Sequence, residues 1–257
     1  MNVRHHITDC QMLTRNPTPQ SQEKEWFMFA AGLMIKVCSD YIAMRWLHNC
    51  EPLTCAPTIC VTMLDVVEKS LKLHLAVQKK MATALTDMSS KYGHNVEALR
   101  DACAPFTPTF PDDDVRAFTK DLNDRDGKLY QQLRYGSQKT TGGFSTNLST
   151  LRPVVDKIFC ESILQLPDDT RKVLVFSSPL KQLLVGTQFD QSRHPAQLVE
   201  ALRKENAYFD RLFQYCLQIE EEHATLAALL TAQRHRVMPN MRLCRRRDVR
   251  KRAAAQR

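Results

Sequence analysis

Apolar residues recur every three to four positions along most of this 257-residue chain, the spacing that builds one face of a helix. The first such segment covers residues 23–49 and carries one apolar stripe, formed by Phe27, Ala30, Met34, Val37, Tyr41 and Met44. Residues 1–21 are polar, end in NPTPQS and show no such stripe. The pattern predicts a flexible arm followed by the first long helix of an all-α protein.

The second segment, PTICVTMLDVVEKSLKLHLAVQKKMATALTDM, is the most apolar of the chain. Pro57 fits the first turn of a helix, where its missing N–H is not needed. From Ile59 to Val77 the segment is apolar on nearly every side, which is typical of a central bundle helix. Its polar exceptions are Asp65, Glu68, Lys69, Lys72 and His74.

A turn and a short helix follow in KYGHNVEALRDAC, residues 91–103. Gly93 is expected to end the second helix, and Asn95 is a good N-cap for a short return helix. The apolar stripe of that helix would consist of Val96, Leu99 and Cys103. His94 therefore stands at a helix entrance.

Two further helices complete the predicted bundle. Three aspartates, residues 112–114, would start a helix that runs to about Tyr135, because negative charge is favourable at a helix N-terminus. After the glycine-containing connector GSQKTTGGFST, a helix over residues 147–166 turns its apolar face inward. We therefore expect a helical bundle over residues 22–166.

The C-terminal third is expected to hold a linker with a short helix over residues 167–194, and then one long helix over residues 195–236. Within the linker, KVLVF reads as β-like, but a strand without a partner is unstable. The long helix carries a heptad seam, interrupted by Glu205 and His223. A second copy or another protein is expected to bind this seam through Leu198, Leu202, Phe209, Leu212, Ile219, Leu226 and Leu230.

Positive charge is concentrated at the C-terminus. Residues 234–257 contain nine Arg and one Lys against one Asp, a net charge of +9, whereas the whole chain carries +8. Clustered arginines pair with phosphates and release counterions, so residues 237–257 predict an RNA-binding or polyanion-binding tail. The tail has no aromatic residue to stack on bases, and its expected contacts are Arg242, Arg245, Arg246, Arg247, Arg250, Lys251 and Arg252.

Other classes of function find little support in the sequence. Nine scattered cysteines and a polar N-terminus favour a cytoplasmic protein, and the apolar run Trp26–Val37 is too short to span a bilayer. The series His48, Cys50, Cys55 and Cys60 lacks the close cysteine pairs of structural zinc sites, so no metal is expected. No common nucleotide-hydrolase or hydrolase motif occurs, and no cofactor is expected.

Three segments resemble the HEPN superfamily of small helical bundles, found in prokaryotic toxin–antitoxin, defence and RNA-processing proteins. They are PTICVTMLDVVEKSLKLHLAVQKK, GHNVEALRDAC and YQQLRYG, within residues 23–166. The resemblance implies a helical bundle that acts on or binds RNA. Catalytic members carry an Arg followed by four to six residues and then a His, and no Arg of this chain has a His at that spacing.

The candidate chemistry leaves alternatives open. His94 and Asn95 either cap a helix or contact a nucleotide, and Glu68, Lys69, Lys72 and His74 either form ion pairs or line an RNA or nucleotide cleft with Arg134 and Tyr135. We expect a non-catalytic RNA-associated binding and dimerisation module, within a defence or toxin–antitoxin system. The alternatives are a metal-independent ribonuclease that combines His74, His94 and Arg134, and a structural adaptor assembled through the C-terminal helix.

Overall fold

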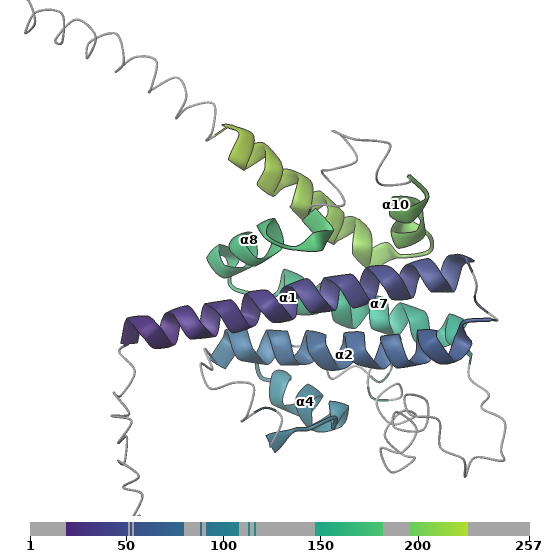
Figure 1. Ribbon diagram of the computed structural model, residues 1–257, viewed down its shortest axis with the longest axis horizontal. Helices are drawn as coiled ribbons and strands as arrows, with labels where there is room; N and C mark the ends of the chain where they lie inside the picture. Colours follow the sequence, from purple (N-terminus) through teal and green to yellow (C-terminus); the bar gives the residue numbers. More distant parts are fainter. Residues whose placement is uncertain are drawn as a thin grey trace, which may run out of the picture.

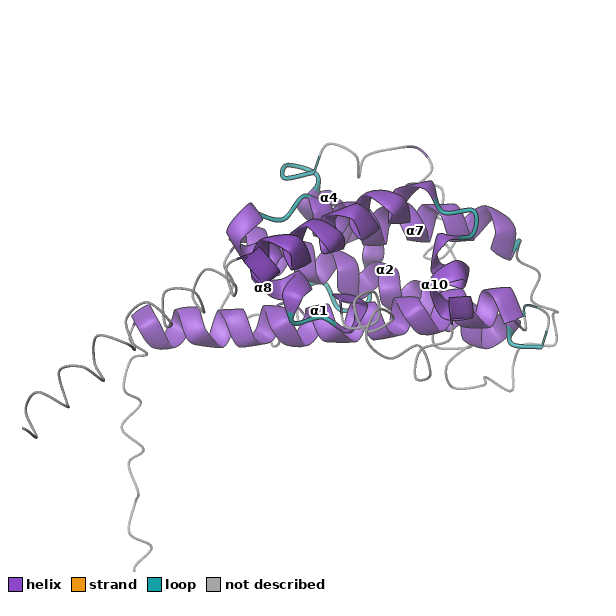
Figure 2. Cartoon of the chain, turned by 90° about the horizontal axis from the view of Figure 1, so that it is seen from above, coloured by secondary structure: helices purple, strands orange, loops and turns teal. Residues whose placement is uncertain are grey.

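The computed structural model describes residues 19–50, 54–79, 91–107, 147–181 and 196–225, with the single residues Pro52, Met88, Asp113 and Arg116. These parts of the chain are helical, with turns between the helices and no strand (Figure 2). The all-α prediction is therefore confirmed for them. Of the predicted helix over residues 112–135, only Asp113 and Arg116 are described, and both are helical. The connector after it and the basic tail lie outside the described residues.

Two long antiparallel helices form the frame of the fold (Figure 1). Helix α1 spans Pro19–Cys50 and helix α2 spans Ala56–Lys79. The Trp26 indole donates a hydrogen bond of 2.9 Å to the carbonyl of Ala76, which fixes the start of α1 against the end of α2. Both predicted helices are confirmed, although α1 begins within the predicted arm, at Pro19.

Helix α2 is the centre of the packing, as its composition predicts. It contacts α1, α7 (Leu148–Leu164) and α4 (Val96–Cys103). Most of its side chains from Ile59 to Val77 are buried, including the polar residues Glu68, Ser70 and His74. A helix covered on several sides in this way needs apolar residues around most of its circumference.

The helical body does not close at residue 166, which corrects the predicted boundary. Helix α8 spans Asp168–Phe176, so KVLVF is helical, and its Leu174 and Val175 are fully buried in the same core as α1 and α2. Asp168 and Asp169 stand in the first turn of α8, where the helix dipole favours acidic residues.

The long helix predicted over residues 195–236 is interrupted. Helix α10 spans Ala196–Arg203, the chain turns at Lys204 and Glu205, and residues 207–225 form a separate helix. Glu205 has a φ of 52°, in the left-handed region that ends helices. Asn206 then caps the next helix by accepting a hydrogen bond of 3.1 Å from the Phe209 N–H.

The heptad seam faces the protein's own core. Its described members Leu202, Phe209, Leu212 and Ile219 are buried within the chain, and Leu198 is half-buried. The four buried residues are not available to a second chain, so their predicted partner-binding role is wrong. For the half-buried Leu198 that role stays a prediction. Leu226 and Leu230 lie outside the described residues.

Helix α1 is longer than its apolar run suggested. The stretch Glu23–Cys50 is long and apolar enough to cross a membrane by length and composition alone, which corrects the sequence estimate. In this fold one side of α1 packs against α2 and carries the fully buried Arg45. One third of the most apolar 18-residue stretch of α1 is buried. The side of α1 that packs against α2 is therefore part of the core.

Candidate functional site

Helix α2 ends at Lys79, so the prediction that Gly93 ends it is wrong, but Gly93 does form the turn that enters α4. Gly93 has a φ of 52°, a conformation that glycine adopts without steric cost, and its N–H donates to the carbonyl of Met88. The Asn95 side chain accepts a hydrogen bond of 3.0 Å from the Ala98 N–H and so caps α4. The N-cap interpretation of Asn95 is confirmed.

A buried carboxylate links this turn to α2. Glu68 Oε2 lies 2.8 Å from His94 Nδ1, and Glu68 Oε1 lies 2.5 Å from Lys72 Nζ. Lys72 also donates a hydrogen bond of 2.9 Å to the carbonyl of Gly93. We call Glu68, Lys72, Gly93 and His94 the turn cluster. Its members hold the turn against α2 and fix the orientation of the His94 ring.

His94 combines this fixed orientation with access to solvent. Its side chain is 60% exposed, whereas that of Glu68 is 10% exposed. A carboxylate beside one ring nitrogen of a histidine sets the tautomer and the direction of the other nitrogen. An imidazole held in this way can bind a phosphate oxygen or exchange a proton with a ligand. His94 is therefore the best-placed group for ligand chemistry among the described candidates.

Lys69 belongs to a different cluster. Its ammonium lies 2.5 Å from Asp40 Oδ2 on α1 and 2.9 Å from Asp65 Oδ2 on α2. Burial lowers the pKa of Lys69, but hydrogen bonds with Asp40 and Asp65 outweigh it, so the pKa is raised and the ion pairs persist at neutral pH. This cluster joins α1 to α2, and it separates Lys69 from the turn cluster.

His74 is a core residue. It is fully buried, its Nδ1 lies 3.1 Å from the carbonyl of Ser162, and its Nε2 lies 2.5 Å from the Thr107 hydroxyl. The Ser162 carbonyl can only accept, so Nδ1 carries the proton and Thr107 donates to Nε2. Burial lowers the pKa of His74, which stays neutral. The predicted roles of His74 in an RNA cleft or a composite ribonuclease site are therefore wrong.

The remaining predicted contacts are not placed. Arg134, Tyr135 and the tail residues Arg242 to Arg252 lie outside the described residues. For the cysteines, Cys60 is buried, Cys55 is half-buried and Cys50 is exposed. No group of three or more His, Cys, Asp or Glu side chains converges as metal ligands within the part of the chain that the structure describes.

Sequence reasoning missed a buried polar network that joins α1, α7 and the 204–206 turn. Arg45 Nη1 lies 3.1 Å from Asp156 Oδ2, and the Tyr41 hydroxyl donates a hydrogen bond of 2.8 Å to Asp156 Oδ1. The Asn206 amide donates to the Tyr41 oxygen at 2.7 Å. We call these four residues the core network. The sequence did carry two signals of this network. Arg45 stands at an inward position of α1, and Asp156 stands at an inward position of α7.

Arg45 also caps helix α10. Its guanidinium donates to the carbonyls of Ala201 and Leu202, which are among the last carbonyls of that helix and have no partner within it, and to the carbonyl of Lys204 in the turn that follows. A cation at a helix C-terminus is further favoured by the helix dipole. This contact explains why the heptad-patterned segment breaks after Arg203, because the carbonyls find their partner on α1.

Compared with known protein families, characterised proteins and solved structures, the chain shows no significant match.

Proposed function

We propose that this chain is a HEPN-like helical module that binds RNA through its Arg-rich C-terminal segment, without catalysing a reaction. The observation that carries the proposal is the separation of charge along the chain. Residues 234–257 hold a net charge of +9, and the other 233 residues hold 26 basic and 27 acidic side chains. The chain therefore offers one strongly basic segment attached to a nearly neutral body.

The ion pairs of the body support this division. Among the described residues, every buried Arg, Asp and Glu has an oppositely charged partner within the chain. Buried charges must be paired in this way because an unpaired buried ion is costly. Charges paired inside the body contribute little to a distant polyanion, so the C-terminal segment is the main source of attraction.

The turn cluster supports a second, shorter-range contact. His94 presents an oriented, solvent-exposed imidazole next to the Lys72 ammonium. Such a pair suits one phosphate or one base edge of a nucleotide. In this proposal the C-terminal segment supplies most of the affinity, and His94 contributes one contact that depends on its ring.

The test measures binding of the full chain to a labelled single-stranded RNA over a range of salt concentrations. Changing Arg242, Arg245, Arg246, Arg247, Arg250, Lys251 and Arg252 to Gln should weaken binding about 100-fold or more at low salt. Seven phosphate contacts correspond to a slope of log K against log salt of about −5, and the variant should lose most of that slope. A matched variant with Lys at all seven positions keeps the charge and should retain most of the slope. Unchanged affinity in the Gln variant would refute the proposal.

A metal-independent ribonuclease is the second candidate, and the Glu68–His94 contact favours it. A carboxylate that orients a histidine is a common arrangement for general base catalysis. Incubation with a mixed RNA pool in EDTA separates the two candidates. Cleavage that disappears in His94→Ala but persists in His74→Gln would identify an enzyme, whereas RNA that is bound but stays intact supports the binding module.

A further inference from the structure

One side of helix α1 is apolar and is not covered by the other described residues. Met28 is 63% exposed and Ile35 is 46% exposed, Gly32 and Ser39 are exposed, and Ile42 and Trp46 are half-buried. These six positions, which we call the outer seam, are spaced 4, 3, 4, 3 and 4 residues apart. At 100° per residue they fall within about 80° of the helix circumference. Figure 2 shows α1 along one edge of the helical body.

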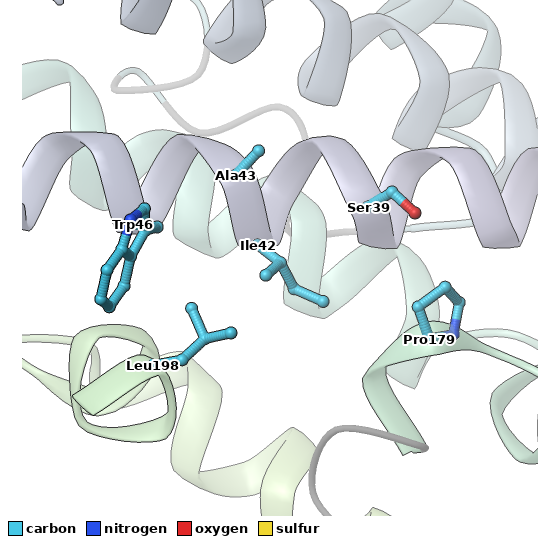
Figure 3. A pocket seen from close by; sticks show the side chains of 6 residues that line it. All are labelled: Ser39, Ile42, Ala43, Trp46, Pro179 and Leu198. Carbon is cyan, nitrogen blue, oxygen red and sulfur yellow. The ribbon is translucent and has the colours of Figure 1, made fainter. Parts of the chain in front are cut away.

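The outer seam continues into an apolar groove. Ile42 and Trp46 face Leu198 of α10, and Pro179 lies at the opposite end, on the side of Ser39, around a hollow of about 390 Å³ (Figure 3). The groove widens the apolar surface beyond α1 at the Trp46 end. An exposed apolar stripe of this length, rather than scattered single residues, is typical of an interaction surface.

We propose that the outer seam binds the same seam of a second copy of this chain. Its spacing is that of helices which pack with knobs into holes. Large and small side chains also alternate along it, because Gly32 and Ser39 separate Met28, Ile35 and Ile42. In an antiparallel pair centred on residue 37, Gly32 of one copy faces Ile42 of the other, Ser39 faces Ile35, and Met28 faces Trp46. This arrangement is self-complementary, as an isologous dimer requires.

Gly32 is the strongest single indication. Glycine inside a helix costs about 0.5–1 kcal/mol relative to alanine. A Cβ added at Gly32 would meet no atom within 4 Å, so no contact within the described residues accounts for the glycine. Close approach of a second helix does account for it. The hydroxyl of Ser39 donates to the Ile35 carbonyl at 2.9 Å, so its hydrogen bond survives when a partner covers it.

The available surface sets the strength of the dimer. The seam from Met28 to Trp46 is about 27 Å long at 1.5 Å per residue. A standard interface buries about 800 Å² per partner, and one helix face with its adjoining groove reaches only the low end of that range. We therefore expect a dimer that dissociates on dilution, with a Kd in the micromolar range.

The test is sedimentation velocity of the full chain between about 1 and 300 µM in moderate salt, without RNA. The wild-type chain should shift from monomer to dimer over this range. Ile35→Lys places a charge at the centre of the seam and should weaken the dimer at least 30-fold. Val173→Lys changes a residue of α8 that is 51% exposed, and it is the matched control because it should leave the dimer unchanged.

Gly32→Leu separates loss of the interface from loss of folding. It replaces a poor helix former with a good one, so the Tm of the monomer should rise, while the larger side chain blocks the close approach and weakens the dimer. A wild-type chain that stays monomeric, or a dimer that survives both seam variants, would overturn the proposal. Two results would assign another occupant and equally overturn it: binding to phosphatidylcholine vesicles that Ile35→Lys abolishes, or a monomer whose Tm falls in Ile35→Lys because the chain itself covers the seam. The proposal does not depend on RNA binding.

Discussion

The core network and the turn cluster have similar chemistry and opposite surroundings. Each is built around a carboxylate that meets a cation and a second hydrogen-bonding side chain: Asp156 with Arg45 and Tyr41, and Glu68 with Lys72 and His94. The core network is almost completely excluded from water, whereas His94 is mostly exposed. The first arrangement holds elements together, and the second leaves one oriented side chain at the surface.

The location of each cluster explains its use. The core network connects α1 to α7 and to the turn before residues 207–225, and both of these segments lie more than 100 residues after α1 in sequence. Its Tyr41 ring also stacks on Phe159 at a centroid distance of 3.7 Å. The turn cluster joins α2 to a turn only some 20 residues later. We infer that the core network fixes the position of the C-terminal helices, while the turn cluster positions a single residue.

The largest expected effect is the loss of stability in Arg45→Met. The substitution leaves Asp156 buried without its cation and removes the donors for the last carbonyls of α10, so it should cost about 3–5 kcal/mol. Lys72→Met is the matched change in the turn cluster. It should cost about 1–2 kcal/mol, because Glu68 keeps His94 as a partner. Denaturant unfolding measures both, and equal losses would contradict the distinction between the two clusters.

A second prediction concerns pH. Burial raises the pKa of Asp156 to about 6 from 3.8, against the opposing effects of Arg45 and the Tyr41 hydrogen bond. The folded state therefore binds this proton more tightly than the unfolded state does. As the pH rises from about 4 to about 6, the wild-type chain should lose about 3 kcal/mol of stability relative to Asp156→Asn.

His74 should change the stability with pH in the direction opposite to Asp156, so the contributions of the two residues can be measured separately. Its pKa is lowered by burial, so its contribution to stability is present above pH 6.5 and is lost as the pH falls below that value. The measurement is the free energy of unfolding of the wild-type chain, Asp156→Asn and His74→Gln at each pH. If stability changes with pH in the same way in the wild-type chain and in Asp156→Asn, Asp156 titrates alike in the folded and unfolded states and the prediction is wrong.

Local sequence patterns predicted the helices well. Helices α1, α2, α4 and α7 carry their apolar stripes within their own residues, and the caps of α4 and α7 stand directly before them at Asn95 and Asn147, so a window of the sequence contains the needed information. The break after Arg203 is different, since the heptad pattern continues through it. The break depends on Arg45, whose side chain reaches α10 from more than 150 residues earlier in the sequence. Long-range capping of this kind leaves no mark in the local pattern.

The candidate residues on α2 could have been separated by geometry. At 100° per residue, Lys72 lies about 40° from Glu68 around the helix, and His74 lies about 120° away on the other side. The structure agrees, because Lys72 shares a partner with the turn and His74 faces α7. The prediction of one cleft lined by Glu68, Lys69, Lys72 and His74 did not take into account that these side chains point in different directions around the helix. By contrast, the contact between Glu68 and His94 depends on how the turn folds back, which sequence spacing does not fix.

The smallest expected effect tests whether the turn is held locally. Asn95→Ala removes the side-chain acceptor for the Ala98 N–H and should cost about 1 kcal/mol. The loss should be concentrated in α4, so amide hydrogen exchange should speed up there before it changes in α1 or α7. Asn95→Asp keeps the acceptor and is the control. If Asn95→Ala instead speeds exchange in residues 207–225, the turn and the core network form one cooperative unit, and the comparison drawn between them fails.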